Sequence, residues 1–181
     1  MTLAELNTVP RYRAEDELNQ VCGSRAWVRG ITGRRPFGNL DRLLRAASEV
    51  WWSLDETDWR EAFDAHPKIG AAPTSAWSAE EQSGMRRAGA GLTMDLEAAN
   101  QEYFVKFGYI FIVCASGKSA EEMLAILRSR LANPPEREIR IAAEEQDKIA
   151  RLRLEKLLKP CSESARTFWI LQKANRHKAC G

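Results

Sequence analysis

Apolar residues recur every three or four positions along most of the chain, which is the spacing of one face of an α-helix. Leu43, Val50 and Trp51 share such a face in a segment that Asn39 can cap. The pattern predicts helices over residues 13–22, 25–32, 40–54, 59–63, 79–88, 93–107, 120–131 and 136–158. Because helices do not alternate with strands, we expect an all-α fold, a single bundle-like domain of about eight to ten helices over residues 1–158.

Three segments lie outside this helical pattern. Residues 1–10 are expected to form a lead-in that ends at Pro10. Residues 109–115 are a continuous apolar run with β-branched residues, which predicts a buried strand or a buried extended segment. Cys114 in this run has no evident basic neighbour to lower the pKa of its thiol, so we expect an inert buried thiol. Residues 159–181 have weak periodicity and a basic bias, and we expect a partly disordered tail.

The stretch from Phe63 to Gly70 is the first candidate for chemistry, because it contains His66, the one histidine outside the basic tail. The ordinary pKa of imidazole lets it exchange protons near neutral pH. Pro67 fixes its own φ angle and biases His66 toward extended backbone, which indicates a helix end followed by a stiff loop. Loops of this kind commonly support catalytic groups. The residues alone also allow a histidine that merely ends a helix.

Arg153 is the second candidate, because it falls on the apolar face of the last predicted helix. At about 100° per residue, that face collects Ile139, Ala142, Ala143, Gln146, Ile149, Ala150, Arg153, Leu154 and Leu157. A buried guanidinium is costly unless a carboxylate or an anionic ligand pairs with it. Arg153 is therefore either an anion receptor in a pocket, a structural ion-pair partner, or a side chain that reaches the protein edge. Arg151 falls on the polar side and is expected to be solvated.

A capping-box pattern places a carboxylate at the start of another predicted helix. Ser78 is the expected N-cap, and Glu81 stands at the third helical position. This capping role is sufficient to explain why a glutamate stands at position 81. Because a helix N-terminus also favours anions, a capping role and a substrate-binding role can coexist there.

Composition narrows the classes of function. The 181 residues carry 27 basic and 25 acidic side chains, a formal net charge of +2, which argues against nucleic-acid binding driven by bulk charge. No apolar run approaches the roughly 18 residues of a membrane span, and the first residues lack the features of a secretory signal. The cysteines form no CxxC pair and the two histidines are far apart, so no metal site is expected. We expect a cytoplasmic, metal-free domain.

Six short blocks follow one another in a specific order between residues 35 and 154. They are Arg35-Pro36-Phe37, Asp58-Trp59-x-Glu61-Ala62-Phe63-x-x-His66-Pro67-Lys68-Ile69-Gly70, Trp77-Ser78-x-x-Glu81-Gln82-x-Gly84, Asn100-x-x-Tyr103-x-x-Lys106-Phe107-Gly108, Phe111-Ile112-Val113-Cys114-Ala115-x-Gly117-Lys118 and Lys148-Ile149-x-x-Leu152-Arg153-Leu154. In this order they resemble the family of OHCU (2-oxo-4-hydroxy-4-carboxy-5-ureidoimidazoline) decarboxylases, which act in the conversion of urate to allantoin. The resemblance covers about residues 3–158.

The resemblance implies an all-helical, cofactor-free carboxy-lyase that converts OHCU to (S)-allantoin and carbon dioxide. It implies that His66 is the catalytic acid, that Glu81 contacts the substrate, and that Arg153 is the arginine of the closing block. From the chemistry of decarboxylation we expect Glu81 to orient the imidazole or the ureido group, and Arg153 to bind an anionic oxygen of the substrate. The substrate-contacting residues would be Pro67, Ser78, Gln82, Phe111, Ile112, Val113, Cys114 and Ala115, the last five through backbone groups.

The resemblance also bears on assembly and location. Many members of the family are dimers, and Ile141 and Leu152 on the otherwise polar side of the last helix are consistent with a homodimer. The chain ends in Lys178-Ala-Cys-Gly181, without a peroxisomal address of the Ser-Lys-Leu type, which favours a bacterial, cytoplasmic version.

Two alternative functions stay open at this point. The first is a catalytically silent helical interaction module on the same scaffold, which predicts loss of His66, Glu81 or Arg153, although all three are present. The second is the neighbouring hydrolysis of 5-hydroxyisourate, which needs a water-activating group of residues and finds no second histidine nearby. A nucleic-acid role for the basic tail is weakly supported, because few aromatic residues accompany its cations.

Overall fold

The computed structural model describes residues 1–66 and 90–158, and these ranges contain eight helices and no strand. The helices are α1 (Leu3–Thr8), α2 (Arg11–Val21), α3 (Arg25–Gly33), α4 (Leu40–Ser53), α5 (Glu56–Asp64), α7 (Ala90–Phe107), α8 (Ala120–Arg130) and α9 (Pro135–Leu157). The prediction of an all-α fold is confirmed. The helix predicted over 79–88 and the tail over 159–181 lie outside the described residues.

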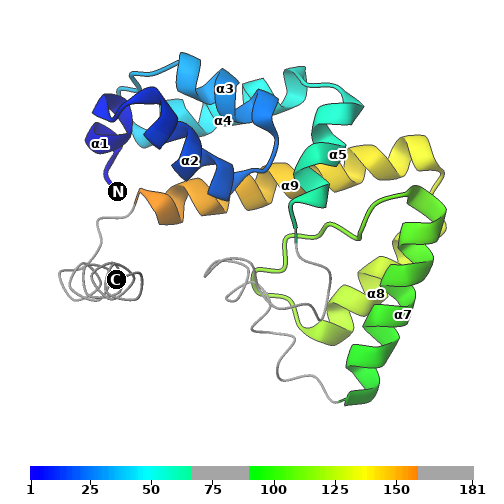
Figure 1. Cartoon of the computed structure of the whole chain (residues 1–181). Helices are drawn as coiled ribbons and strands as arrows, with labels where there is room; N and C mark the ends of the chain where they lie inside the picture. The colour runs from blue at the N-terminus through cyan, green and yellow to red at the C-terminus, as the bar shows by residue number, and fades with distance from the viewer. Residues whose placement is uncertain (67–89, 159–181) are drawn as a thin grey trace, which may run out of the picture.

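Helix α9 runs the length of the molecule and joins its two parts (Figure 1). Helices α2, α4 and α5 pack on it from one side, and α7, which pairs with α8, packs near its N-terminal end. Trp51 of α4 donates its indole N–H to the Ala143 carbonyl of α9 at 2.9 Å. The Met1 ammonium group donates to the Leu157 carbonyl at 3.0 Å, so the start of the chain is attached to the end of α9.

Side-chain caps stand at the start of several helices, among them the cap predicted at Asn39. Ser24 accepts a hydrogen bond from the Trp27 N–H at the start of α3, and Asn39 accepts one from the Arg42 N–H at the start of α4. Ser119 and Glu122 form the capping box of α8. Each cap satisfies a backbone donor that has no partner within the helix.

The lead-in expected over residues 1–10 contains the short helix α1, which the sequence pattern did not predict. Thr2 and Glu5 form a complete capping box, in which each side chain accepts a hydrogen bond from the backbone N–H of the other residue. Leu6 is completely buried, so the core holds this helix in place. Six residues are too few for a periodic apolar pattern to be recognised, and the capping box is the signal that indicates the helix.

The apolar face predicted for α9 is confirmed, because all nine of its residues are buried. Glu138 is buried as well, which the apolar pattern did not indicate. The prediction that Arg151 is solvated is wrong in part, because Arg151 is half-buried and donates to the Ser48 hydroxyl of α4 at 3.3 Å.

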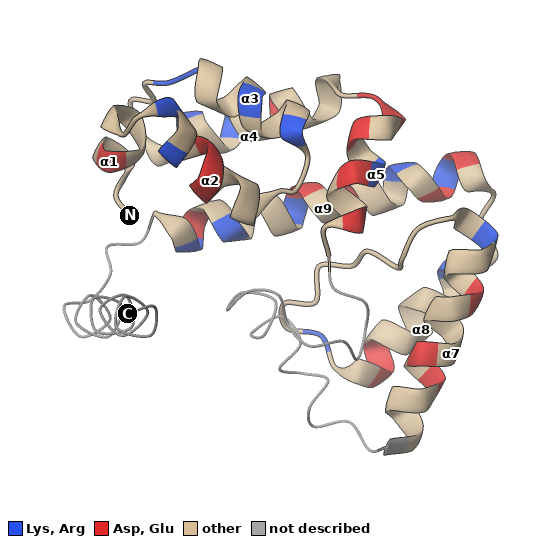
Figure 2. Cartoon of the chain, viewed as in Figure 1, with Lys and Arg blue, Asp and Glu red and all other residues tan. Residues whose placement is uncertain are grey.

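Figure 2 shows acidic and basic residues interspersed along α9, in line with the near-balanced charge of the chain. In the two described ranges, no helix is both long enough and apolar enough to cross a membrane.

Candidate active site

His66 lies at the end of α5, one residue after the C-cap Ala65, and the prediction of a histidine at a helix end is confirmed. Asp55 caps this helix by accepting hydrogen bonds from the N–H groups of Thr57 and Asp58 at 2.9 and 3.1 Å. Phe63 is fully buried, with its ring centroid 5.1 Å from that of Tyr109. The His66 N–H donates to the Phe63 carbonyl at 3.1 Å, so the buried helix end fixes the backbone that carries the half-buried imidazole.

Gly23 allows the end of α5 to lie where it does. A Cβ atom built on Gly23 would stand 2.2 Å from the Cβ atom of Ala65, the residue before His66. Gly23 follows Cys22, the C-cap of α2, but it does not have the positive φ angle that favours glycine after a helix end. A glycine is required here because two backbone segments approach closely.

The His66 imidazole is hydrogen-bonded to α9. Its Nε2 atom lies 2.6 Å from Oε1 of Gln146, a residue 80 positions further along the chain. Gln146 is completely buried, and its amide nitrogen Nε2 has no hydrogen-bond partner among the described residues. Sequence reasoning placed Gln146 on the inward face of α9 and gave it no role, because no local pattern joins it to His66.

Arg153 lies on the same face of α9 as Gln146, about 10 Å further along the helix axis. Its side chain is buried, which confirms the inward orientation predicted from the helical pattern. Its Nη1 atom donates to the Val21 carbonyl at 3.2 Å. Val21 is the last residue of α2, where carbonyl groups lack helical partners and the helix dipole attracts cations.

Cys22, the C-cap of α2, directly follows the residue whose carbonyl accepts from Arg153. Burial raises the pKa of the Cys22 thiol to about 12, although a hydrogen bond with the Ser24 backbone and the charge of Arg153 act in the opposite direction. The thiol is therefore protonated at neutral pH and is not a nucleophile.

Residues 109–115 form a segment without helix or strand that connects α7 to α8, which confirms the prediction of a buried extended segment rather than a strand. Gly108, with φ near +79°, ends α7 before it. Asn100 accepts from the Phe111 N–H at 2.9 Å, and Arg130 donates to the Ile112 carbonyl at 2.8 Å. The Cys114 thiol is buried, as predicted.

Some backbone groups of this segment are already used by the protein and others are not. The Cys114 N–H donates to Glu145 of α9 at 2.7 Å, and its carbonyl accepts from the Lys118 ammonium group at 2.6 Å. The backbone N–H groups of Ile112 and Val113 make no hydrogen bond among the described residues. The same holds for the Ala115 N–H, so these three backbone donors are not used by the described part of the protein.

Glu145 holds the segment against α9. It accepts from the Cys114 N–H and pairs with Lys148 at 2.6 Å. Burial alone would raise the pKa of this carboxyl group, but the hydrogen bonds from Lys148 and Cys114 outweigh it, and the pKa is lowered. The hydrogen bond to Glu145 raises the pKa of Lys148. Glu145 is therefore a carboxylate at neutral pH.

A buried ionic group fixes the other side of the segment. Glu138 is fully buried and accepts from the Arg130 guanidinium at 2.6 Å, from the Asn133 amide at 2.7 Å and from the Tyr103 hydroxyl. Because Arg130 also donates to the Ile112 carbonyl, this group connects α7, α8, α9 and the segment. Sequence reasoning missed both Arg130 and Glu138. The sequence signal for this pair was a basic residue at the end of α8 and an acidic residue near the start of α9, each next to the apolar face of its helix.

Four predicted site residues, Pro67, Ser78, Glu81 and Gln82, lie outside the described residues. In the ranges 1–66 and 90–158, no three His, Cys, Asp or Glu side chains are grouped as metal ligands would be.

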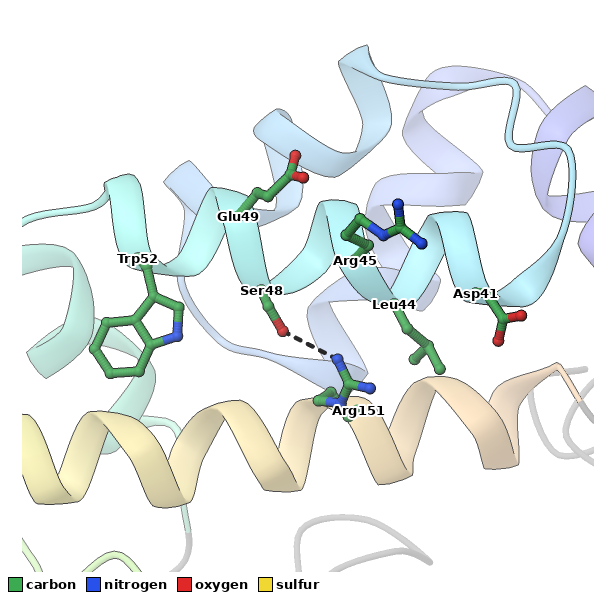
Figure 3. A pocket seen from close by; sticks show the side chains of 7 residues that line it. All are labelled: Asp41, Leu44, Arg45, Ser48, Glu49, Trp52 and Arg151. Atoms are coloured by element: carbon green, nitrogen blue, oxygen red, sulfur yellow. Dashed lines mark hydrogen bonds between the residues drawn. The ribbon is translucent and has the colours of Figure 1, made fainter.

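A separate hollow lies between α4 and α9 (Figure 3). It is lined by Asp41, Leu44, Arg45, Ser48, Glu49, Trp52 and Arg151. Its volume of about 560 Å³ would accommodate a small molecule, but its lining mixes two arginines with two carboxylates and includes none of the predicted site residues. Arg151 points toward α4 in Figure 3, and at about 100° per residue it lies on a different side of α9 from Gln146 and Arg153, so this hollow is distinct from the candidate active site.

The fold and the site define a class, an all-α protein in which a helix-end histidine, a buried arginine and an extended apolar segment are all held by one long helix. The sequence model described as OHCU decarboxylase matches residues 7–155. The chain belongs to the OHCU decarboxylase family.

Known relatives agree with this assignment. The uric acid degradation bifunctional protein of Arabidopsis thaliana is 36% identical over 152 residues, covering 79% of this chain and 47% of that protein. The chain thus spans about half the length of that relative. The 2-oxo-4-hydroxy-4-carboxy-5-ureidoimidazoline decarboxylase of Amia calva is 31% identical over 131 residues, covering 68% of this chain and 75% of the relative.

Solved structures show the same fold. A crystal structure of an OHCU decarboxylase in the presence of (S)-allantoin is 39% identical, has a TM-score of 0.72, and the match covers 79% of this chain and 97% of that one. A crystal structure of an (S)-allantoin synthase, 18% identical with a TM-score of 0.68, is similar over 88% of this chain and 54% of its own, and supports the fold alone.

Proposed function

We propose that this protein decarboxylates OHCU to (S)-allantoin and carbon dioxide in urate degradation. The observation that carries the proposal is the half-buried His66, held at a helix end by Gln146 in a chain of the OHCU decarboxylase family. The names of the relatives support this activity. They do not favour a silent interaction module or a hydroxyisourate hydrolase.

The chemistry of the reaction needs no cofactor. Loss of carbon dioxide leaves an electron pair on a ring carbon beside carbonyl and imine-type groups, so the substrate is its own electron sink. The protein has to hold the scissile bond out of the ring plane and exclude water. It also has to deliver a proton to one face of the ring, which sets the (S) configuration.

The roles of the site residues follow from this requirement. His66 polarises the substrate and supplies the proton, while Glu81 orients the imidazole or the ureido group. Arg153 binds an anionic oxygen through its planar guanidinium. The N–H groups of Ile112, Val113 and Ala115 offer backbone donors to the substrate ring, since those of Phe111 and Cys114 already bond to Asn100 and Glu145.

The remaining contacts are proposed from the family resemblance. Pro67, Ser78 and Gln82 contact the substrate from the part of the chain between α5 and α7. The enzyme works in the cytoplasm as a homodimer, with the half-buried Ile141 and Leu152 at or near the contact between subunits.

The test couples urate oxidation and hydroxyisourate hydrolysis to this protein and follows the optical activity of the allantoin formed. OHCU also decays spontaneously, so enzymatic turnover is the rate above that background. We expect (S)-allantoin from the wild type and near-background rates from His66→Asn with the helical content unchanged. Racemic allantoin at the spontaneous rate from the wild type would refute the proposal, and near-wild-type turnover by His66→Asn would refute the role of the histidine.

A further inference from the structure

We propose that Gln146 is a positioning residue for the reaction: its amide oxygen holds the His66 imidazole in the tautomer that carries a proton on Nε2. This inference rests on the proposed function and adds a residue to its machinery. The consequence is that the proton His66 gives to the substrate is the one on Nδ1. The contact that carries the inference is the 2.6 Å separation between His66 Nε2 and Gln146 Oε1.

The chemistry of the two groups sets the direction of this hydrogen bond. An amide oxygen only accepts, so the imidazole nitrogen facing it must carry a proton in both the neutral and the cationic forms. The other ring nitrogen, Nδ1, then gains and loses the proton during turnover. A histidine that is held in one tautomer and one ring orientation does not have to reorganise during the reaction.

Stability by itself does not account for a glutamine at this position. Gln146 is completely buried, and its amide nitrogen has no partner among the described residues. A buried donor without a partner costs about 1–3 kcal/mol, whereas an apolar side chain of the same shape has no such cost. The polar contact that compensates the burial of this amide is the one with His66.

The place of Gln146 on α9 supports a positioning role. Its neighbour Glu145 holds the Cys114 N–H of the extended segment at 2.7 Å, and Arg153 follows two turns later on the same face. The same rigid helix therefore holds the proposed acid, the segment that offers backbone donors, and the proposed anion-binding arginine. Through Gln146, the position of His66 is fixed relative to the other two.

The test compares two variants of the full chain. Gln146→Met keeps the length of the side chain and removes the amide, and Gln146→Glu keeps an oxygen acceptor. The matched control is Gln101→Met on the exposed side of α7, which is expected to leave both activity and the imidazole signals unchanged. The readouts are the ¹⁵N chemical shifts of the imidazole nitrogens at a pH where the ring is neutral, steady-state kinetics, and thermal unfolding. His66→Asn assigns the His66 signals against those of His177.

For the wild type we expect the Nε2–H pattern at His66. Gln146→Met should unfold at the same temperature as the wild type or higher, give a mixture of tautomers, and lower kcat by about 10- to 100-fold with little change in KM. Gln146→Glu should keep the Nε2–H pattern and recover part of the lost kcat.

Two results would overturn the inference: an Nδ1–H pattern at His66 in the wild type, or an unchanged kcat in Gln146→Met. The tautomer readout does not depend on turnover. The wild type could be inactive and still show the Nε2–H pattern at His66, with that pattern absent from Gln146→Met. This result would refute the proposed function and support the contact between Gln146 and His66.

Discussion

Replacing Gly23 by alanine should damage the candidate site without touching any residue of it. The added Cβ atom would stand 2.2 Å from the Cβ atom of Ala65, whereas apolar carbons in contact are about 3.5–4.0 Å apart. The two segments must therefore separate by about 1.3–1.8 Å. Neither Cβ atom can rotate away, so the backbone before His66 has to move.

The size of the effect follows from this displacement. Overpacking of this kind costs about 1–3 kcal/mol, which for a chain of this length lowers the melting temperature by about 2–12 °C. A displacement of the catalytic group by about 1 Å can lower kcat by up to about 100-fold. Thermal unfolding and the coupled (S)-allantoin assay measure the two effects separately.

Two further variants test whether the close approach of Gly23 to Ala65 positions His66. In Gly23→Ala/Ala65→Gly the nearest atoms to the new Cβ are the Ala65 Cα at 3.7 Å and the Glu61 carbonyl oxygen at 3.8 Å, which are ordinary contacts. The double variant should recover most of the lost kcat, with about 1 kcal/mol still lost through the new glycine. Gly33→Ala is the matched control, because no atom lies within 4 Å of its added Cβ. A wild-type kcat in Gly23→Ala, or no recovery in the double variant, would show that the close approach does not position His66.

Three other substitutions test the rest of the site. Arg153→Lys keeps the charge but loses the planar fork, so KM should rise roughly tenfold while the helical content stays unchanged; an unchanged KM would exclude a substrate contact by the guanidinium. Because the pKa of Glu145 lies below its ordinary value of 4.5, the carboxylate stabilises the fold above that pH and this contribution is lost as the pH falls through its pKa. Glu145→Gln should therefore cost about 1–2 kcal/mol in urea unfolding at pH 7 and progressively less below about pH 4, and a cost independent of pH would contradict this. Glu138→Ala leaves the buried Arg130 without its carboxylate and should cost about 3–5 kcal/mol, so wild-type stability in that variant would show that the buried pair is replaceable.

Periodicity and capping predicted most of the fold, because these signals depend on residues that are close in the sequence. The inward face of α9, including Arg153, was correct on helical geometry alone. The close approach of Gly23 to Ala65 was not predicted, because it depends on how the ends of α2 and α5 meet in the folded chain. The pairing of Arg130 with Glu138 was missed because the two residues lie on successive helices, and no pattern within one helix indicates a contact between them.

The candidate site was harder to predict, because its contacts join distant parts of the chain. His66 could be proposed from its local sequence, but its partner Gln146 is 80 residues away and looks like an ordinary member of a buried face. In the described part of the chain, the Gln146 amide bonds to His66 through its oxygen while its nitrogen has no partner, and this contact gives the residue its role. A polar residue predicted on an apolar face is therefore informative, since its burial requires a partner that the sequence does not name.

The dependence of the site on α9 has a physical reason. A helix keeps residues seven positions apart on the same face at a nearly fixed distance, about 10 Å, with little freedom to bend over two turns. Gln146 and Arg153 have this spacing, and Glu145 adds a contact to the extended segment from the adjacent position. If the substrate is held between His66 and Arg153, its size has to match the distance between them. That distance is set by a helix and not by a loop. Rigid placement of this kind favours a reaction in which the protein's main task is to orient one bond and deliver one proton.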